Sequence, residues 1–258
     1  MHARLALLRQ LVQRELQDRY RGSLLGFAWA FLLPLGMVAI YTFVFGFVFD
    51  ARWGAGGSNP FEFAVFLYCG LVPYQFLADA LSRAPGLLFG YAALVKKVAF
   101  PLPLLAVAAT LASAIHMLIG FVVLMGSAGL ALDHVPMAIV LAPIAALPLL
   151  LFALGAVLML SSASVFFRDL SQVVLVLLPA LLFLSPVFYP VSAVPDAMQA
   201  VMRINPLSGV IENVRALVTG RSTVDIVSLA LTTLAGGATA ALGAVWFRRL
   251  QPGFADAV

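Results

Sequence analysis

The sequence predicts an all-α polytopic membrane protein, and three observations support this fold class. Hydrophobic residues make up 63% of the 258 residues and charged residues only 10%, and the mean hydropathy is +1.07. A water-soluble domain needs more charge than this to cover its surface. Uncharged stretches recur along the chain, and several reach the ~20 apolar residues that cross a bilayer. The charged segments between them are short, so we expect residues 1–258 to form a single transmembrane domain.

Six transmembrane helices are expected, the first of which is uncharged from Gly22 to Phe49. The second is the shortest, because the uncharged stretch between Glu62 and Asp79 contains only sixteen residues, including Pro73. It is therefore expected to be kinked or to extend past those two charges. The six expected spans are residues 22–49, 63–81, 102–132, 136–166, 170–190 and 225–247.

Residues 1–21 are expected to form an amphipathic interfacial helix. On a helical projection five apolar residues fall within about 120°, as in a helix that lies on a membrane surface. Arg9 and Arg19 fall inside the same arc and would have to extend to the interface. A cleavable signal peptide is the alternative, but the apolar run that follows exceeds the usual seven to fifteen residues. The stripe consists of Leu5, Leu8, Val12, Leu16 and Tyr20.

The distribution of basic residues predicts the orientation. Eleven lie on one side of the expected spans and four on the other, and basic residues favour the cytoplasmic side. Six spans also require both termini to share a side, so we expect both in the cytoplasm. Membrane lipid explains a net charge of +4 in such an apolar chain better than nucleic acid does. The side with four carries Arg52, Arg203, Arg215 and Arg221.

The chemistry that the spans lack narrows the function. Apart from Cys69, tyrosines and carboxylates at the span ends, their only ionisable residue is His116, whereas ion-coupled transporters place acids or histidines at the midplane. A serine enzyme with His116 as base is a remote alternative, because small hydroxyl residues more often pack helices. The chain has no phosphate-binding loop, so another subunit would have to bind ATP and Mg²⁺. No cofactor or metal is expected in this chain.

Aromatic residues alternate at the end of the first span. Tyr41, Phe45 and Phe49 form one helical stripe, and Phe43 and Phe47 form another nearly opposite. An aromatic belt at the membrane interface is one interpretation. The other is a passage lined with ring faces, which attract the C–H groups of sugars.

Residues 191–221 are expected to form an external gate hairpin. Prolines interrupt the fifth span, and the residues that follow are apolar but punctuated by charges. Broken helices occur at membrane depth only where protein or a water-filled cavity covers their backbone. We expect two short helices, at 196–202 and 206–218, which are either re-entrant or lie as a hairpin on the membrane.

Four blocks of sequence, in order and correctly spaced between Arg14 and Arg249, are similar to the membrane subunits of polysaccharide ABC exporters. This type-2 permease family moves O-antigen, teichoic acid and capsular polysaccharide. One departure concerns the second block, where Leu102 stands in place of the basic residue of many relatives. The blocks are Arg14 to Leu16 with Arg19 to Gly26 and Trp29; Ala93 to Pro101; Phe167 to Leu170; and Ser185 to Pro190 with Asn205 to Leu207 and Arg215.

The resemblance implies a homodimer with two cytoplasmic ATPase subunits in the bacterial inner membrane. Its cargo would be a polyprenyl-diphosphate-linked glycan. Residues 83–97 would form a cytoplasmic coupling helix, or else a solvated basic loop. Its contact residues would be Arg83, Tyr91, Leu94, Lys96 and Lys97.

Two further sets of residues are assigned to the cargo as hypotheses. Guanidinium groups bind phosphate oxygens in pairs, so Arg14, Arg19 and Arg21 would attract the diphosphate, although anionic lipid explains them equally well. The rival functions are export of drugs or small lipids, an intramembrane lipid-modifying enzyme, and a structural scaffold. The glycan passage would be lined by Tyr41, Phe45, Phe49, Phe188 and Tyr189.

Overall fold

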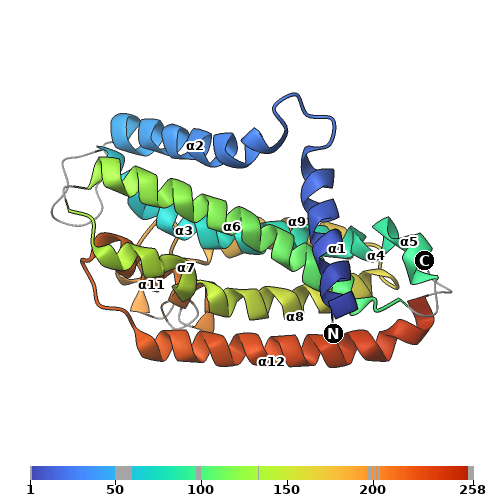
Figure 1. Ribbon diagram of the computed structural model, residues 1–258. Coiled ribbons are helices and arrows are strands. Elements are labelled where there is room, and N and C mark those ends of the chain that lie inside the picture. Colours follow the sequence, from blue (N-terminus) through green and yellow to red (C-terminus); the bar gives the residue numbers. More distant parts are fainter. Residues whose placement is uncertain are drawn as a thin grey trace.

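The computed structural model describes residues 2–49, 60–96, 100–132, 134–196, 199, 202 and 204–254. These residues form an elongated bundle of helices, and no strand occurs among them (Figure 1). The all-α membrane fold is therefore confirmed. Within the described ranges five helical stretches are long and apolar enough to span a membrane: Gly26–Val48, Phe61–Gly90, Pro103–Ala131, Met137–Ser164 and Ile226–Gly253.

The fifth expected span, at 170–190, is a shorter helix. α9 (Leu170–Phe183) has 14 residues, fewer than a crossing needs. It ends there because Pro186 has no N–H to donate and its ring would clash with the preceding turn. The other elements are α1 (His2–Tyr20), α2 (Trp29–Tyr41), the π-helix η2 (Thr42–Val48), α3 (Pro60–Arg83), α6 (Pro103–Ala131), α7 (Ala142–Ala145), α8 (Leu147–Ser164), α11 (Pro206–Thr219) and α12 (Ile226–Leu250).

The expected coupling helix at 83–97 is not a single helix. Its described part consists of a 3₁₀ turn, η3 (Ala84–Gly86), and two one-turn helices, α4 (Leu87–Gly90) and α5 (Ala92–Val95). Tyr91, at φ −116° and ψ 27°, leaves the helical conformation between them. Gly86 and Gly90 favour such breaks, because glycine loses the most conformational freedom in a helix. Lys97 lies outside the described residues.

α3 is the central helix of the bundle and packs against α6, α8, α9 and α11. It extends past both Glu62 and Asp79, so these carboxylates belong to the helix itself. α8 and α12 pack closely against each other through glycines. A Cβ atom at Gly155 would overlap the backbone of Thr239, and one at Gly236 would lie 2.7 Å from the carbonyl oxygen of Pro148. The two backbones therefore approach closely only because these positions carry no side chain.

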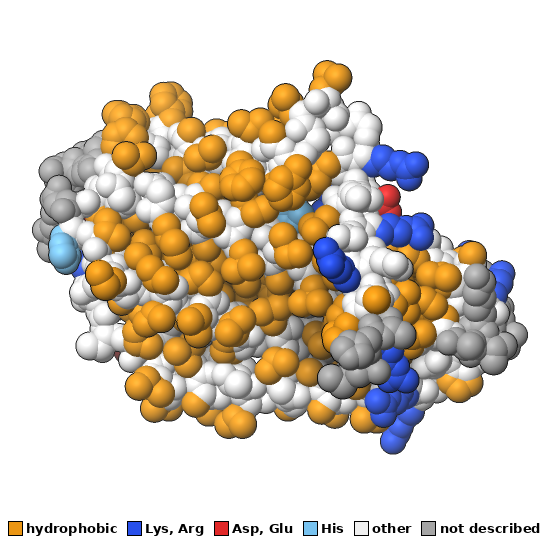
Figure 2. Space-filling model, viewed as in Figure 1, with side chains coloured by type: hydrophobic (Ala, Val, Ile, Leu, Met, Phe, Trp, Pro, Cys, Tyr) orange, Lys and Arg blue, Asp and Glu red, His pale blue; other side chains and the backbone are white. Residues whose placement is uncertain are grey.

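The two ends of the bundle differ in composition. α1 lies across one end, where α12 also ends and where the Ser164 hydroxyl donates to the Pro85 carbonyl over 2.8 Å. α11 occupies the opposite end (Figure 1). Hydrophobic side chains cover the face between the ends, and Lys and Arg side chains gather around α1 (Figure 2). We name these the α1 end and the α11 end.

α11 is embedded in the bundle. It begins at Pro206, with the Asn205 side chain accepting from the Leu207 N–H, and it ends at Gly220 in the left-handed conformation. Ten of its residues are buried against α3, α7 and α12. α11 corresponds to the second helix expected in the external hairpin, at 206–218. Most of the first expected helix, at 196–202, lies outside the described residues.

Candidate functional site

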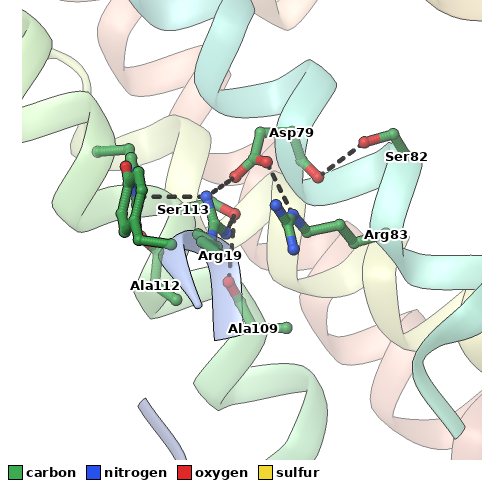
Figure 3. Close-up of polar contacts among 9 residues, drawn as sticks. Arg19, Asp79, Ser82, Arg83, Ala109, Ala112 and Ser113 are labelled. Atoms are coloured by element: carbon green, nitrogen blue, oxygen red, sulfur yellow. Dashed lines mark hydrogen bonds and ion pairs between the residues drawn. The ribbon is translucent and has the colours of Figure 1, made fainter. Parts of the chain in front are cut away.

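A cluster of polar side chains joins α1, α3 and α6 inside the α1 end, and we call it the junction cluster. Arg19 of α1 donates to Asp79 of α3 over 2.6 Å and to Ser113 of α6 over 3.0 Å. Arg83, one turn beyond Asp79, donates to the other carboxylate oxygen over 2.9 Å (Figure 3). The Arg19 side chain is only 6% exposed. The cluster therefore holds a buried positive charge by means of a carboxylate from another helix. Its members are Arg19, Tyr20, Asp79, Arg83, Ser113 and His116.

His116 completes the junction cluster. Its Nδ1 lies 3.0 Å from the carbonyl oxygen of Ala112, to which it donates when it carries the proton, and 3.2 Å from Nη1 of Arg19, from which it accepts in the other tautomer. Nε2 is in hydrogen-bond contact with the Tyr20 hydroxyl, from which it accepts when the proton is on Nδ1. Burial raises the pKa of Tyr20, which keeps that hydroxyl protonated and able to donate. The rings also stack at 5.7 Å between centroids. Tyr20 and Arg19 thus attach the last turn of α1 to the bundle.

A cavity of about 390 Å³ opens beside the junction cluster. Its walls come from the end of α1, from α2, and from the facing surfaces of α3 and α6. Polar groups of the junction cluster lie at one part of the wall, and the remainder is formed by apolar side chains of α2, α3 and α6 together with Gln75 of α3. The cavity is therefore amphipathic.

The three arginines assigned to the headgroup are not together. Arg14 and Arg21 are exposed, and both face Asp18 of the same helix, at 3.6 and 3.9 Å. Arg19 instead points into the bundle. The helical projection placed Arg19 on the apolar arc and predicted that it extends to the interface, and it could not identify Asp79 as the partner. Two features of the sequence pointed to this site: Asp79, a carboxylate near the end of the second expected span, and His116, a lone histidine in the third.

The coupling segment is attached to α1. The Tyr91 hydroxyl donates to Glu15 over 2.7 Å, and the Arg14 guanidinium lies 5.0 Å from the ring centroid. Burial, reinforced by Glu15, raises the pKa of Tyr91 and keeps it a donor. Tyr91 is therefore covered by α1, while Leu94 is partly buried and Lys96 is exposed.

Aromatic rings from three segments meet around Phe45 of η2. Its ring centroid lies 6.2 Å from Tyr41, 5.9 Å from Phe49, 5.5 Å from Phe63 and 6.2 Å from Phe188. We call these five residues the aromatic cluster. Four of the five residues assigned to the glycan passage therefore lie together.

Three aromatic residues near the aromatic cluster do not belong to it. The fifth assigned residue, Tyr189, is partly exposed, and its hydroxyl donates to the Phe183 carbonyl oxygen. Phe43 and Phe47 lie on the other face of η2, where they line an apolar cavity of about 720 Å³ between α2 and α6. The two aromatic stripes of this segment thus have different surroundings, as their spacing predicts.

A second buried arginine holds the segment that follows α9. Arg215 of α11 donates to the Pro186 carbonyl oxygen over 2.8 Å and to Glu212 over 3.0 Å. Prolines break the helix in this segment, so the Pro186 carbonyl has no N–H partner within a helix. The Arg215 guanidinium supplies the missing hydrogen bond. Because Phe188 follows two residues later, Arg215 also positions one member of the aromatic cluster.

The described residues contain no group of three or more His, Cys, Asp or Glu side chains that could hold a metal ion. The polar groups of the α1 end are instead arranged as donor and acceptor pairs between helices. Such an arrangement can bind charged groups and can separate when helices move.

Comparison with known proteins gives a consistent result. The family model for the ABC-2 type transporter matches residues 6–218. The O-antigen export system permease protein RfbA of Myxococcus xanthus is 31% identical over 214 residues, which are 82% of this chain and 79% of that protein. A protein of the same name from Klebsiella pneumoniae is 25% identical over 256 residues, 97% of this chain and 94% of that protein.

A third relative has a different name. The polysialic acid transport protein KpsM of Escherichia coli is 24% identical over 211 residues, 78% of this chain and 77% of that protein. The family match covers most of the helical bundle, including α1, the junction cluster and α11. The chain belongs to the ABC-2 type transporter family, and it is a transmembrane permease subunit rather than an enzyme.

Proposed function

We propose that this chain is the transmembrane subunit of an ATP-driven exporter of a lipid-linked polysaccharide. The cargo is an O-antigen or similar surface glycan on polyprenyl diphosphate, carried from the cytoplasm to the outer face of the inner membrane. The observation that carries this proposal is the similarity to relatives named as O-antigen permeases along nearly the whole chain. An ATPase partner follows from membership in the family, and ATP and Mg²⁺ belong to that partner.

The assembly is a homodimer of this chain with two ATPase subunits. Two helices support a partner in the membrane, because α2 and α9 expose large apolar side chains along most of their length, including Leu32, Leu33, Val176 and Leu177. Exposed apolar surface of this kind suits lipid or a second copy. Both termini face the cytoplasm. The gathering of Lys and Arg around α1 supports this orientation, since basic residues favour the cytoplasmic side (Figure 2).

The aromatic cluster is the proposed contact for the glycan. The faces of aromatic rings attract the polarised C–H groups of sugars and form no directional bonds that would stop a chain from sliding. Phe49 is 67% exposed, and Phe188 is partly exposed beside it. These rings can therefore touch a passing polymer, while Phe45 and Phe63 support them from within the bundle.

Force from the ATPase enters at the α1 end. Movement of α4 and α5 is transmitted to α1 through the contact between Tyr91 and Glu15. Arg19 then connects α1 to α3 and α6 through Asp79 and Ser113. A continuous set of side-chain contacts thus runs from the coupling segment to α3, which carries Phe63 of the aromatic cluster.

Location of the glycan in cells tests this function. In cells that lack the chain, lipid-linked glycan should accumulate inside while surface glycan disappears, as measured by surface labelling against total extract. Restoring the chain should reverse both changes. Unchanged surface glycan would contradict the proposal, and loss of small-molecule efflux in the same cells would then favour a drug or small-lipid exporter.

A further inference from the structure

The cavity beside the junction cluster has the chemistry of a lipid site. Its volume of about 390 Å³ falls within the ~300–1,000 Å³ of typical ligand pockets. Arg19, Asp79, Arg83, Ser113 and His116 contribute to one part of its wall. Apart from Tyr20 and Gln75, the rest is apolar and includes Trp29, Leu33, Met37, Val72, Phe76 and Met117. A ligand that fills this cavity needs a polar head and an apolar chain.

The polar groups of the cavity lie at the depth that a lipid headgroup has in a bilayer. Asp79 lies nineteen residues after the start of α3, about 28 Å along the helix axis at 1.5 Å per residue. The hydrocarbon core is about 30 Å thick, so Asp79 and Arg83 lie near its boundary at the α1 end. The apolar wall extends from this level toward the middle of the spans, where Val72 lies two turns earlier in α3. Headgroup and chain would thus occupy the levels they have in a bilayer.

The charges of the cavity favour an anion. Two guanidinium groups, from Arg19 and Arg83, share one carboxylate, so the polar wall carries one excess positive charge. Nε of Arg19 is buried and has no hydrogen-bond partner among the described residues. Arg83 is 42% exposed, so it can turn toward a ligand while Arg19 retains Asp79. Guanidinium groups bind phosphate oxygens with charge-assisted hydrogen bonds.

We propose that this cavity binds the phosphate group of an anionic lipid through Arg83 and Arg19, with the first part of the lipid chain between α2, α3 and α6. The ligand class is a phosphate or diphosphate ester on a long apolar chain. That the lipid is the exporter's cargo, held before transport, rests on the proposed function. Membrane phospholipid offers the same phosphate chemistry, and the test distinguishes the two sources.

Binding to the full chain, purified in a phosphate-free detergent, is the direct test. The probes are a polyisoprenyl phosphate, the polyisoprenol of equal length and phosphatidylglycerol, each followed by native mass spectrometry. The polyisoprenyl phosphate should bind about tenfold more tightly than the alcohol, as expected from one charge-assisted hydrogen bond of ~1.5 kcal/mol. Equal binding of phosphate and alcohol would overturn the proposal.

Two variants with matched controls locate the site. Arg83→Gln should weaken binding of the polyisoprenyl phosphate about tenfold, which is the loss of a charged hydrogen bond. Arg248→Gln, an exposed change in the last turn of α12, should leave it unchanged. Leu33→Trp should fill the cavity from α2 and abolish binding, whereas Ile40→Trp on the same exposed helix should not. Equal effects of variant and control would overturn the proposal.

Competition between the two lipids shows which of them the cavity prefers. Failure of phosphatidylglycerol to displace the polyisoprenyl phosphate assigns the site to the cargo, and equal displacement assigns it to membrane phospholipid. Both results support a lipid-phosphate site. Export in cells is measured in parallel, because the two proposals can fail separately. Normal export without phosphate-dependent binding overturns the site alone, while binding without any export contradicts the proposed function alone.

Discussion

In the part of the chain that the structure describes, one arginine is buried near each end, and the two are held in different ways. Arg19 at the α1 end pairs with side chains of two other helices, α3 and α6, and lies beside a cavity. Arg215 at the α11 end pairs with Glu212 of its own helix and donates to the backbone carbonyl oxygens of Pro186 and of Phe66 in α3. The first arrangement joins helices through side chains, and the second holds a broken segment through backbone groups. We therefore expect the α1 end to open more readily than the α11 end.

The largest effect is expected when Arg19 loses its counter-ion. Asp79→Asn leaves a buried guanidinium uncompensated, which typically costs about 3–5 kcal/mol of stability. The double variant Arg19→Gln with Asp79→Asn should recover most of this loss, since no buried charge remains. Thermal unfolding in detergent, followed by size-exclusion fluorescence, measures both. If the double variant is as unstable as the single one, charge pairing is not what holds the junction cluster together.

A smaller loss is expected at the α11 end. Arg215→Gln removes the donor to the Pro186 carbonyl, and an unsatisfied buried acceptor costs about 1–3 kcal/mol. Glu212 is 41% exposed and can be solvated, so adding Glu212→Gln should rescue nothing. The same thermal assay applies. If Glu212→Gln restores stability, Arg215 is held mainly by charge pairing, as Arg19 is, and the two ends do not differ.

The attachment of α1 to the coupling segment should be weaker still. Tyr91→Phe removes the hydrogen bond to Glu15 but keeps the ring under Arg14, at a cost of about 1 kcal/mol. Hydrogen exchange should increase in α1 and in residues 84–96 and stay unchanged in α11. Faster exchange at both ends would show that the α1 end does not open independently.

The aromatic cluster should affect transport with almost no effect on stability. Phe49 and Phe47 are similarly exposed, at 67% and 61%, but only Phe49 contacts Phe45. Phe49→Ala should reduce surface glycan severalfold at an unchanged level of the protein in the membrane, because one ring face is lost from the passage. Phe47→Ala is the matched control. Equal export by both variants would assign the cluster a purely structural role.

Features that depend on neighbouring residues were predictable from the sequence. Uncharged stretches predict the long helices, because charge in the hydrocarbon core is costly. The spacing of Tyr41, Phe45 and Phe49 predicts a shared face, and the structure joins them around Phe45. Pro206 and Gly220 likewise mark the two ends of α11.

Features that depend on distant residues were not predictable. Arg19 and Asp79 are 60 positions apart, and a helical projection contains only the residues of one helix. The projection therefore suggested that Arg19 extends to the interface, whereas the fold supplies a carboxylate. The coupling segment was expected as one helix because the family resemblance implies a coupling helix and this loop is long and basic. Gly86 and Gly90 favour its breaks locally, and the hydrogen bond from Tyr91 to Glu15, 76 positions away, was not predictable.

Reconstituted transport is the most direct test of whether this permease exports a lipid-linked polysaccharide. The chain and its ATPase partner are placed in liposomes together with lipid-linked polysaccharide, and the glycan transferred across the bilayer is measured with a membrane-impermeant lectin. We predict transfer that requires ATP and both subunits. Hydrolysis of ATP by the assembled complex without any transfer of glycan would contradict the claim that this permease exports a lipid-linked polysaccharide.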